Sequence, residues 1–310
     1  MQITHRCTTK RIKWSIVFTV LCSVVISVLH IFFFCVHHWC ADHQLSNLTY
    51  TKYADKHWAR LYVQSETPDL KTAVEYAMVT RSKDISQDII SKLPNKYIFK
   101  PNHMSGGLAI IEGNKVTKCT SAYYTNCPSC NAIDLLQCLQ KICDHWLQIV
   151  FNPGKEKYYQ YIPPKCMFEE YLGSSGFPMD YRVFTFHGKP FFIQVDETKD
   201  GRHTHDFFTP KWKRIQMREV PEIYPINSLA KQPPFFHEML RHAEILSKPF
   251  IMMRMDFFAF DDQYFFAEFT PSHHGCKGRF IPSAIENYFN LVINNPSEYS
   301  DPEVILQLKE

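Results

Sequence analysis

The chain has 310 residues, of which 45% are hydrophobic, so it can bury the core of one large domain or of two small ones. Its 34 basic and 31 acidic residues leave a formal net charge of only +3. This balance argues against a nucleic-acid-binding protein, which usually carries a strongly basic surface, and we expect no nucleic-acid partner.

The N-terminal segment has the pattern of a membrane anchor. Residues 14–36 carry no fixed charge and would span roughly 35 Å as a helix, against about 30 Å for the hydrocarbon core of a bilayer. Because secretory signal peptides have apolar regions of only about 7–15 residues, this length favours a retained signal anchor. Basic residues precede the segment, and residues 37–44 contain no lysine or arginine. The positive-inside rule therefore predicts a single-pass type II membrane protein with a cytoplasmic tail at 1–13, a stem at 37–47 and an extracytoplasmic remainder, in the Golgi or endoplasmic reticulum.

Two further features fit an extracytoplasmic location. Asn47-Leu48-Thr49 is a sequon for N-glycosylation. Several of the 11 cysteines crowd one segment, namely Cys119, Cys127, Cys130, Cys138 and Cys143, and such crowding predicts disulfides in an oxidising compartment. A zinc site built from the last four is the alternative, although its short middle spacing fits common zinc patterns poorly, and unpaired thiols also stay open.

The part after the stem begins with a helical pattern and continues with strands. Residues 50–92 are expected to be mainly helical, because the stretches 53–63 and 73–93 have spaced apolar positions and no internal glycine or proline. Residues 96–116 indicate a strand, a glycine loop and a second strand. Small residues let backbone N–H groups approach phosphate oxygens, so the Ser105-Gly106-Gly107 loop, with Lys100 before it, is a candidate anion site. An ordinary hairpin turn is the alternative.

The middle of the chain combines a helix with a strand pair. Residues 134–150 have helical spacing of apolar side chains, and residues 180–197 indicate two strands joined at 187–189. Glu169 and Glu170 stand at the end of an earlier strand, where a solvated sheet edge is the structural alternative to a functional role.

Residues 235–248 then predict a short amphipathic helix whose apolar side chains belong to the core. Four histidines, His203, His205, His273 and His274, lack the spacing of known metal motifs. We interpret them as loop residues that are weak candidates for substrate contact.

The most informative segment is an acidic hairpin in an apolar context. Alternating residues at 252–260 and 263–269 predict two strands around a polar turn, which makes Asp256 and Glu268 cross-strand neighbours. Two carboxylates held so close repel each other, and Mg²⁺, which binds one or two carboxylates together with nucleotide phosphates, would relieve that repulsion. The alternative is that Arg254 simply forms a structural ion pair with one carboxylate.

Taken in order, these segments resemble the ATP-grasp fold and, within it, the TupA-like family named for teichuronopeptide synthesis. The matching motifs are YADKHWARLYV at 53–63, the loop at 100–107, PPKCMFEEYLG at 163–173, the strand pair at 180–196, and the R-D…E-T-P pattern at 254–271. The resemblance runs from about residue 48 to 281. It implies an α+β ATP-grasp domain at 48–310, with two subdomains clasping ATP and a hinge near 168–173, preceded by the transmembrane helix.

The resemblance also implies roles for single residues. Those expected to bind ATP are Lys56, Lys100, Ser105, Gly106, Gly107, Glu169, Glu170, Tyr171, Leu172 and Asp180. The two lysines would neutralise phosphates, the small residues would close over them, the strand end would meet adenine, and Asp180 would hold the ribose. Arg182 and Arg254 would stabilise charge on the transferred phosphoryl group, and Asp256, Glu268 and Thr270 would bind Mg²⁺.

Two positions depart from the pattern of the fold. Thr270 stands where the broader fold commonly has asparagine, although the TupA-like pattern also has threonine, and a hydroxyl is the weaker metal ligand. Met104 stands in the glycine loop where a small residue is typical, so loop closure is expected to differ.

The implied reaction is ligation with ATP as cosubstrate. ATP would phosphorylate a carboxylate on a glycan or peptide acceptor, and an amine would displace phosphate to form an amide. The alternatives are a lumenal glycan kinase with the same ATP site, a Golgi-type glycosyltransferase or sulfotransferase, for which no DxD motif or phosphosulfate loop is present, and an inactive scaffold. The sequence leaves the donor, the acceptor and the oligomeric state open.

Overall fold

The computed structural model describes residue 40 and residues 47–151, 156–173, 178–220, 224–227, 230–260 and 262–308. The described residues all belong to the second of two units, residues 39–310. Among them, no helix combines the length and the apolar character needed to cross a membrane. The predicted tail and anchor, and most of the stem, lie outside the described residues, so these assignments stay predictions.

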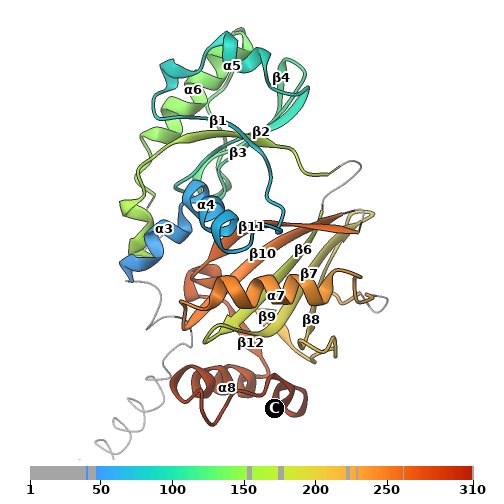
Figure 1. The fold of residues 1–310 in the computed structure, drawn as a ribbon. Helices are drawn as coiled ribbons and strands as arrows, with labels where there is room; N and C mark the ends of the chain where they lie inside the picture. Colours follow the sequence, from blue (N-terminus) through green and yellow to red (C-terminus); the bar gives the residue numbers. More distant parts are fainter. Residues whose placement is uncertain are drawn as a thin grey trace, which may run out of the picture. The chain divides into compact units, whose positions relative to one another are not determined.

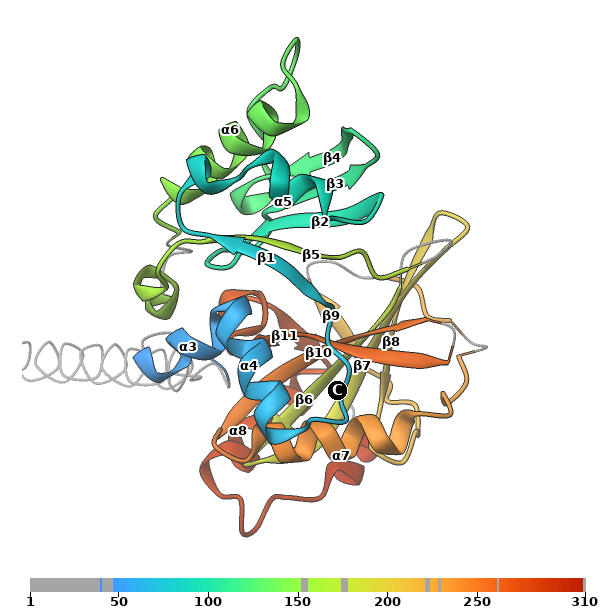
Figure 2. The ribbon, with the colours of Figure 1, turned by 45° about the horizontal axis from the view of Figure 1, so that its top comes forward.

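Two antiparallel sheets of five strands each organise the second unit (Figures 1 and 2). The first has the order β1-β5-β2-β3-β4, with β1 at Glu75–Val79, β2 at Lys96–Pro101, β3 at Leu108–Glu112, β4 at Lys115–Thr120 and β5 at Cys166–Glu170. One face carries Tyr97, Phe99 and Phe168, which pack against helix α6 (Leu135–Leu147). The α6 residue Trp146 contacts the ring of Phe99. Because side chains alternate along a strand, Lys100 lies on the opposite face.

The second sheet has the order β11-β10-β6-β7-β8. Its strands are β6 at Met179–Phe186, β7 at Lys189–Lys199, β8 at Arg202–Phe208, β10 at Met252–Phe260 and β11 at Gln263–Thr270. Val183 on β6 is the partner of both Ile193 on β7 and Met255 on β10, and these apolar residues pack into one core with α7 (Phe236–Ser247). Helix α7 runs across this face of the sheet in Figure 1.

Short helices and a third, two-stranded sheet complete the unit. They are η1 at Leu48–Tyr50, α3 at Thr51–Ala54, α4 at Lys56–Glu66, η2 at Ser82–Asp84, α5 at Gln87–Ser91, η3 at Ala122–Tyr124, η4 at Lys157–Tyr161, β9 at Arg218–Val220, η5 at His273–Cys276, β12 at Arg279–Ile281, α8 at Ser283–Asn294 and η6 at Pro302–Gln307. The carboxylate of Asp55 accepts a hydrogen bond from the His57 backbone N–H, so it caps α4 and makes Lys56 the first helical residue. After α4 the chain touches the second sheet, where Phe266 N–H donates to Lys71 O at 2.9 Å, before it enters β1 of the first sheet.

Most of the predicted elements are confirmed. The structure contains the strand, loop and strand of 96–112, the helix of 135–147, the strand pair of 179–199, the helix of 236–247 and the hairpin of 252–270. The helix predicted for 73–93 is wrong over its first part, because residues 75–79 form β1 and pair with β5. Pairing with a neighbouring strand outweighs helix propensity there.

The histidine assignments also need correction. His203 and His205 lie on strand β8, so interpreting them as loop residues is wrong. His273 and His274 lie in the 3₁₀ turn η5, directly after the hairpin.

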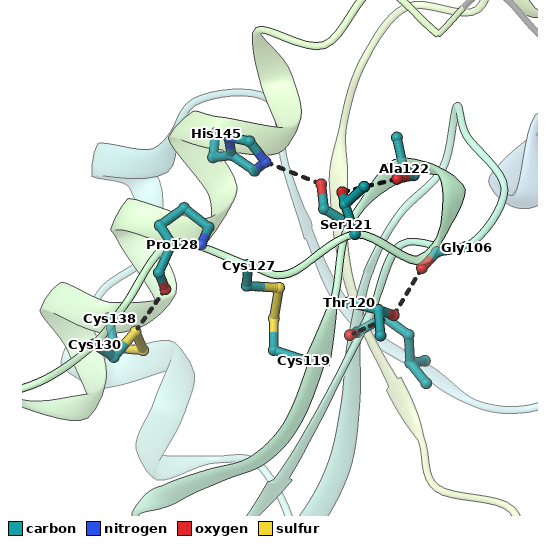
Figure 3. The surroundings of a disulfide bond; sticks show 12 residues. Gly106, Cys119, Thr120, Ser121, Ala122, Cys127, Pro128, Cys130, Cys138 and His145 are labelled. Carbon is teal, nitrogen blue, oxygen red and sulfur yellow. Dashed lines mark hydrogen bonds between the residues drawn. A yellow bond between two sulfur atoms is a disulfide. The ribbon is translucent and has the colours of Figure 1, made fainter.

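Every cysteine of the described residues is part of a disulfide. The four bonds join Cys40 to Cys276, Cys119 to Cys127, Cys130 to Cys138, and Cys143 to Cys166. The predicted disulfides are confirmed, and the alternatives of a zinc site or unpaired thiols in the crowded segment are wrong. Figure 3 shows the Cys119–Cys127 bond beside Thr120, the last residue of β4, whose Oγ1 donates to the carbonyl of Gly106. The disulfide therefore lies next to the strand end that contacts the glycine loop.

Candidate active site

One face of the second sheet is charged where its other face is apolar. Asp256 on β10 is the direct cross-strand partner of Glu268 on β11 and of Arg182 on β6. Residues two apart on a strand share a face, so Arg254, Thr270 and Asp180 lie on the same side. The predicted cross-strand arrangement of Asp256 and Glu268 is therefore confirmed.

Arg254 is the centre of a buried hydrogen-bond network. Its Nε lies 2.7 Å from Asp256 Oδ1 and its Nη2 2.5 Å from Asp256 Oδ2, which makes a bidentate ion pair. The same Nη2 donates to Thr270 Oγ1 at 3.1 Å, and Thr270 Oγ1 lies 3.5 Å from Glu268 Oε1. The ion pair that the sequence offered as a structural alternative thus exists, and it coexists with the paired carboxylates.

His273 orients the far side of this guanidinium, a role that the sequence analysis, which named it only as a weak candidate for substrate contact, did not assign. Its Nδ1 accepts from Arg254 Nη1 at 2.6 Å, and its Nε2 lies 2.6 Å from Glu219 Oε1. Burial lowers the pKa of His273 to about 3, so the ring is neutral and its Nε2–H donates to the carboxylate. Glu219 stands on the short strand β9, far away in sequence, and no local pattern could have linked it to Arg254.

Arg182 is held by two carboxylates on the same face. Its Nε donates to Asp180 Oδ2 at 2.9 Å, and its Nη1 lies 2.8 Å from Asp196 Oδ2. The pKa of Asp180 is raised to about 7, chiefly by burial and also by the charges of Asp256 and Asp196, against the opposing charges of Arg182 and Arg254. Asp196 was not assigned a role from the sequence. Its cross-strand position opposite Asp180 was the available signal.

The inner face of the first sheet carries a second group of charges. Glu169 is buried and forms ion pairs with Lys100 and with Arg60, whose Nη2 lies 2.9 Å from Glu169 Oε1. The interpretation of Glu169 as a solvated edge residue is therefore wrong. Glu170 is half-buried and accepts from the Val74 N–H at 3.1 Å.

The two residues after β5 are half-buried in the segment that leads toward the second sheet. The Tyr171 ring lies 4.4 Å from the ammonium of Lys96, and Leu172 follows it in the chain. The predicted hinge near 168–173 thus coincides with the end of β5, and its role as a hinge stays a prediction.

Lys56 links the two groups of charges electrostatically. Its Nζ donates to the carbonyl of Met104 in the glycine loop at 2.8 Å. Burial lowers the pKa of Lys56, the negative charge of Glu268 opposes this shift, and the positive charge of Lys100 adds to it. Lys56 therefore interacts electrostatically with Glu268, a predicted metal ligand on the second sheet, and with Lys100, a predicted phosphate-binding lysine on the first.

The glycine loop has a tightly determined conformation. Gly106 has φ +82°, and a Cβ added there would lie 2.9 Å from the backbone nitrogen of Tyr124. A Cβ on Gly107 would lie 2.6 Å from Pro101 Cγ. Ser105 is exposed at the tip, whereas Met104 is fully buried in the core of the first sheet. Met104 thus fills the core behind the loop, which gives its departure from the pattern a structural reason.

Tyr159 is a further residue that the sequence analysis missed. Burial raises the pKa of its hydroxyl, and the negative charges of Glu268 and Glu156 raise it further. The positive charge of Arg254 opposes this shift. Tyr159 is therefore a neutral hydroxyl within electrostatic range of the charged face.

The donor set of the charged face fits Mg²⁺ and a nucleotide. Carboxylate and hydroxyl oxygens are the ligands that Mg²⁺ prefers, and Asp256, Glu268 and Thr270 provide them on adjacent strands. Asp180 Oδ1 is buried and has no hydrogen-bond partner in the described part of the chain, so this oxygen can accept a hydrogen bond from a ligand. Arg182, held through its Nε and Nη1, supplies positive charge in the same place.

Two antiparallel sheets, with a glycine loop and lysines on one and paired carboxylates on the other, define an ATP-grasp protein. More specifically, the chain belongs to the TupA-like ATP-grasp family, whose model matches residues 39–290. The predicted ATP-grasp fold and family are thereby confirmed.

Several solved structures resemble the chain at low identity. D-alanine–D-alanine ligase from Bacillus anthracis is 15% identical, with 82% of this chain and 69% of that chain covered and a TM-score of 0.41. Phosphoribosylglycinamide synthetase from Anaerococcus prevotii is 11% identical, with 85% and 53% covered and a TM-score of 0.39. The ATP-grasp ligase PsnB complexed with minimal precursor is 12% identical, with 71% and 52% covered and a TM-score of 0.36. The chain thus spans about half the length of PsnB, and no curated protein matches it.

Proposed function

We propose that this protein is an ATP-dependent carboxylate–amine ligase that acts on a glycan or peptide acceptor. The observation that carries the proposal is the charged face on which Asp256 and Glu268 pair directly, with Arg254 hydrogen-bonded between Asp256 and Thr270. Membership of the TupA-like ATP-grasp family supports ATP and Mg²⁺ as the cosubstrate and cofactor. A glycosyltransferase or sulfotransferase would need a different donor site and has no support from the family.

The residues divide the work between charge neutralisation and orientation. Mg²⁺, held by Asp256, Glu268 and Thr270, would supply positive charge that neutralises the phosphates of ATP. Lys56 and Lys100 would bind phosphate oxygens under the Gly106-Gly107 turn, whose backbone N–H groups add further donors. The segment from Glu169 to Leu172 would contact adenine, and Asp180 the ribose.

Arg254 and Arg182 would stabilise the charge that develops during phosphoryl transfer. Both guanidinium groups are fixed in advance, Arg254 by Asp256 and His273 and Arg182 by two aspartates, so little reorganisation is needed when the charge appears. An oxygen of the acceptor carboxylate would form a bond to the γ-phosphorus, and the bond to the ADP oxygen would break. An amine would then bond to the acyl carbon, and phosphate and a proton would leave.

We also propose that the chain is a type II membrane protein with its catalytic domain on the extracytoplasmic side. The support consists of the uncharged segment at 14–36, the basic residues before it and the four disulfides of the described residues. The membrane and the glycan or peptide acceptor are the partners that this arrangement proposes.

Thermal unfolding of the full chain, with and without Mg²⁺-ATP, tests the nucleotide site. Binding should raise the apparent free energy of unfolding by about 2.7 kcal/mol when ATP is present at about 100 times its dissociation constant. The Glu268→Gln variant should lose most of this increase, because the amide is a poor replacement for a charged metal ligand. Glu112→Gln, at an exposed position of β3, should keep it.

The proposal is contradicted if the wild type shows no Mg²⁺-dependent increase, or if Glu268→Gln shows the full increase. Once binding is established, phosphate release with candidate acceptors and amines separates ligation from the alternative of a glycan kinase. A ligase releases phosphate, whereas a kinase retains it as a phosphoester.

A further inference from the structure

The hairpin of β7 and β8 places three potential metal ligands on one face. Asp200 and Gly201, with φ +51° and +75°, form its two-residue turn. The register pairs Asp196 with His205 and Thr198 with His203. Because residues two apart share a face, the carboxylate and both imidazoles project on the same side of the sheet.

The three ligand atoms have the spacing that a small tetrahedral ion requires. His203 Nε2 and His205 Nε2 lie 3.0 Å apart, and His205 Nε2 lies 3.5 Å from Asp196 Oδ1. Zn²⁺ binds nitrogen and oxygen ligands at about 2.0–2.1 Å, and tetrahedral angles then separate neighbouring ligand atoms by about 3.3–3.4 Å. These two separations bracket this value, and all three ligand atoms lie within 4.8 Å of one another.

The hydrogen-bond partners of the imidazoles support a shared ion. Two Nε2 atoms only 3.0 Å apart have room for one hydrogen between them, so at least one of them must present a lone pair. His203 Nδ1 lies 2.7 Å from Thr198 Oγ1, which can accept the Nδ1–H and leave Nε2 free of hydrogen. His205 Nδ1 is buried without a hydrogen-bond partner in the described part of the chain, so no such contact fixes its tautomer.

The carboxylate is held in place by outer partners. Gln194 Nε2 donates to Asp196 Oδ1 at 3.0 Å, and Arg182 Nη1 lies 2.8 Å from Asp196 Oδ2. The ring of Tyr224 packs against both imidazoles, with centroid distances of 4.7 and 4.2 Å. Such outer contacts are what orient the ligands of protein metal sites.

The second histidine–carboxylate cluster provides a contrast. Glu219 Oε1 lies 2.6 Å from His273 Nε2 and 3.0 Å from His274 Nε2, so one oxygen accepts from both rings. The other nitrogen of His273 accepts from Arg254. In that cluster both rings donate to one carboxylate oxygen, whereas in the β7–β8 cluster the two imidazole Nε2 atoms face each other at 3.0 Å.

We propose that Asp196, His203 and His205 bind a transition-metal ion of the Zn²⁺ type through Oδ1 and the two Nε2 atoms, with a fourth position open to another ligand. Two imidazoles favour Zn²⁺ over Mg²⁺, so the site is distinct from the proposed magnesium site. His205 is buried, and His203 is half-buried and accessible to an ion. The inference does not rest on the proposed ligase activity.

The test is a titration of the metal-depleted full chain with Co²⁺, followed by its visible absorption. The wild type should bind about one Co²⁺ per chain with the intense absorption of a tetrahedral site, and Zn²⁺ should displace it while Mg²⁺ should not. His203→Ala and His205→Ala should each weaken Co²⁺ binding by at least about 100-fold, since they remove a ligand rather than an outer partner. His274→Ala, from the hydrogen-bonded cluster, should bind Co²⁺ like the wild type.

The proposal is overturned if the wild type binds no Co²⁺ in this way, or if His203→Ala binds it as tightly as the wild type. His203 is the better position for the decisive variant, because its side chain is less buried than that of His205. Near-ultraviolet circular dichroism and the thermal midpoint establish that each variant is folded. An unfolded His205→Ala therefore leaves the decision to His203→Ala and His274→Ala.

Discussion

The raised pKa of Asp180 depends on contacts within the charged face that the sequence alone does not reveal. The sequence predicted Asp256 and Glu268 as partners because a hairpin fixes which residues face each other. It could not predict that Asp256 joins Asp180 and its neighbours Arg182 and Asp196, because this requires β10 to pair with β6 across a long stretch of sequence. The pKa of Asp180, raised to about 7, follows from that burial and from the excess of aspartates around it.

Substitution of Asp180 by asparagine should therefore stabilise the protein at neutral pH. The unfolded carboxyl has a pKa of about 3.9, so between about pH 4 and pH 7 the unfolded state loses its proton first and folding stability falls as pH rises. An asparagine side chain does not ionise and would carry no such penalty. We expect the free energy of unfolding of Asp180→Asn to equal that of the wild type near pH 4 and to exceed it by up to about 4 kcal/mol near pH 8.

Denaturant unfolding across this pH range, with disulfides intact, measures the difference. Asp84→Asn is the matched control, because 33% of the Asp84 side chain is exposed and its hydrogen bond with Arg81 lowers the pKa of its carboxyl. That substitution should give no gain at high pH. A variant Asp180→Asn that is less stable than the wild type at pH 8 would show that the ion pair with Arg182 outweighs the burial cost.

At the scale of elements, sequence periodicity predicted the helices and hairpins formed by neighbouring residues. It failed for a strand whose partner lies far away in the sequence. The hairpin of 252–270 and the helix of 135–147 carry their own patterns. Strand β1 does not, since its residues satisfy a helical pattern as well and only the partner β5 decides between them. Strand β8 was missed although Asp200-Gly201 is a strong two-residue hairpin signal.

The glycine loop is the element whose geometry most limits its sequence. In Gly106→Ala the new Cβ would lie 2.9 Å from Tyr124 N and 3.3 Å from Tyr123 N, and these backbone atoms belong to the turn between Cys119 and Cys127. The disulfide restricts how far the turn can retreat. We expect a loss of about 2–3 kcal/mol in the free energy of unfolding and a smaller stabilisation by Mg²⁺-ATP.

The variant Gly113→Ala distinguishes the clash of a new Cβ with neighbouring atoms from the strain of a positive φ in a residue other than glycine. Gly113 also has positive φ, +59°, but its Cβ would meet nothing nearer than Asn95 Oδ1 at 3.8 Å. This variant should lose only about 1 kcal/mol and keep the response to Mg²⁺-ATP. Equal losses in the two variants would mean that the contact between the loop and the Tyr123-Tyr124 turn is not a constraint.

At the scale of the whole molecule, the four disulfides of the described residues are a feature that an oxidising compartment favours. The bond between Cys40 and Cys276 joins residues 236 positions apart and links the predicted stem to the turn that follows the charged hairpin. The Cys143–Cys166 bond connects α6 to β5 within the core of the first sheet. The sequence predicted the crowded cysteines but not this long-range pairing, because spacing alone does not fix connectivity.

An extracytoplasmic location predicts a glycan at Asn47. Asn47 is exposed, and its Oδ1 accepts a hydrogen bond from Thr49 Oγ1 at 2.6 Å. Expressed in eukaryotic cells, the full chain should lose mass on treatment with a glycosidase that removes N-linked glycans. Asn47→Gln and Thr49→Ala should both abolish that change, while Thr49→Ser, which keeps the hydroxyl of the sequon, should retain it.

The three variants distinguish location from folding. Thr49→Ala keeps Asn47 and removes only the hydroxyl, so a loss of the glycan in both Asn47→Gln and Thr49→Ala reflects recognition of the sequon in the secretory lumen. A wild-type chain that is folded, membrane-bound and insensitive to the glycosidase would instead put residue 47 on the cytoplasmic side. The disulfides would then have to form against the reducing poise of that compartment, which is why we expect the lumenal outcome.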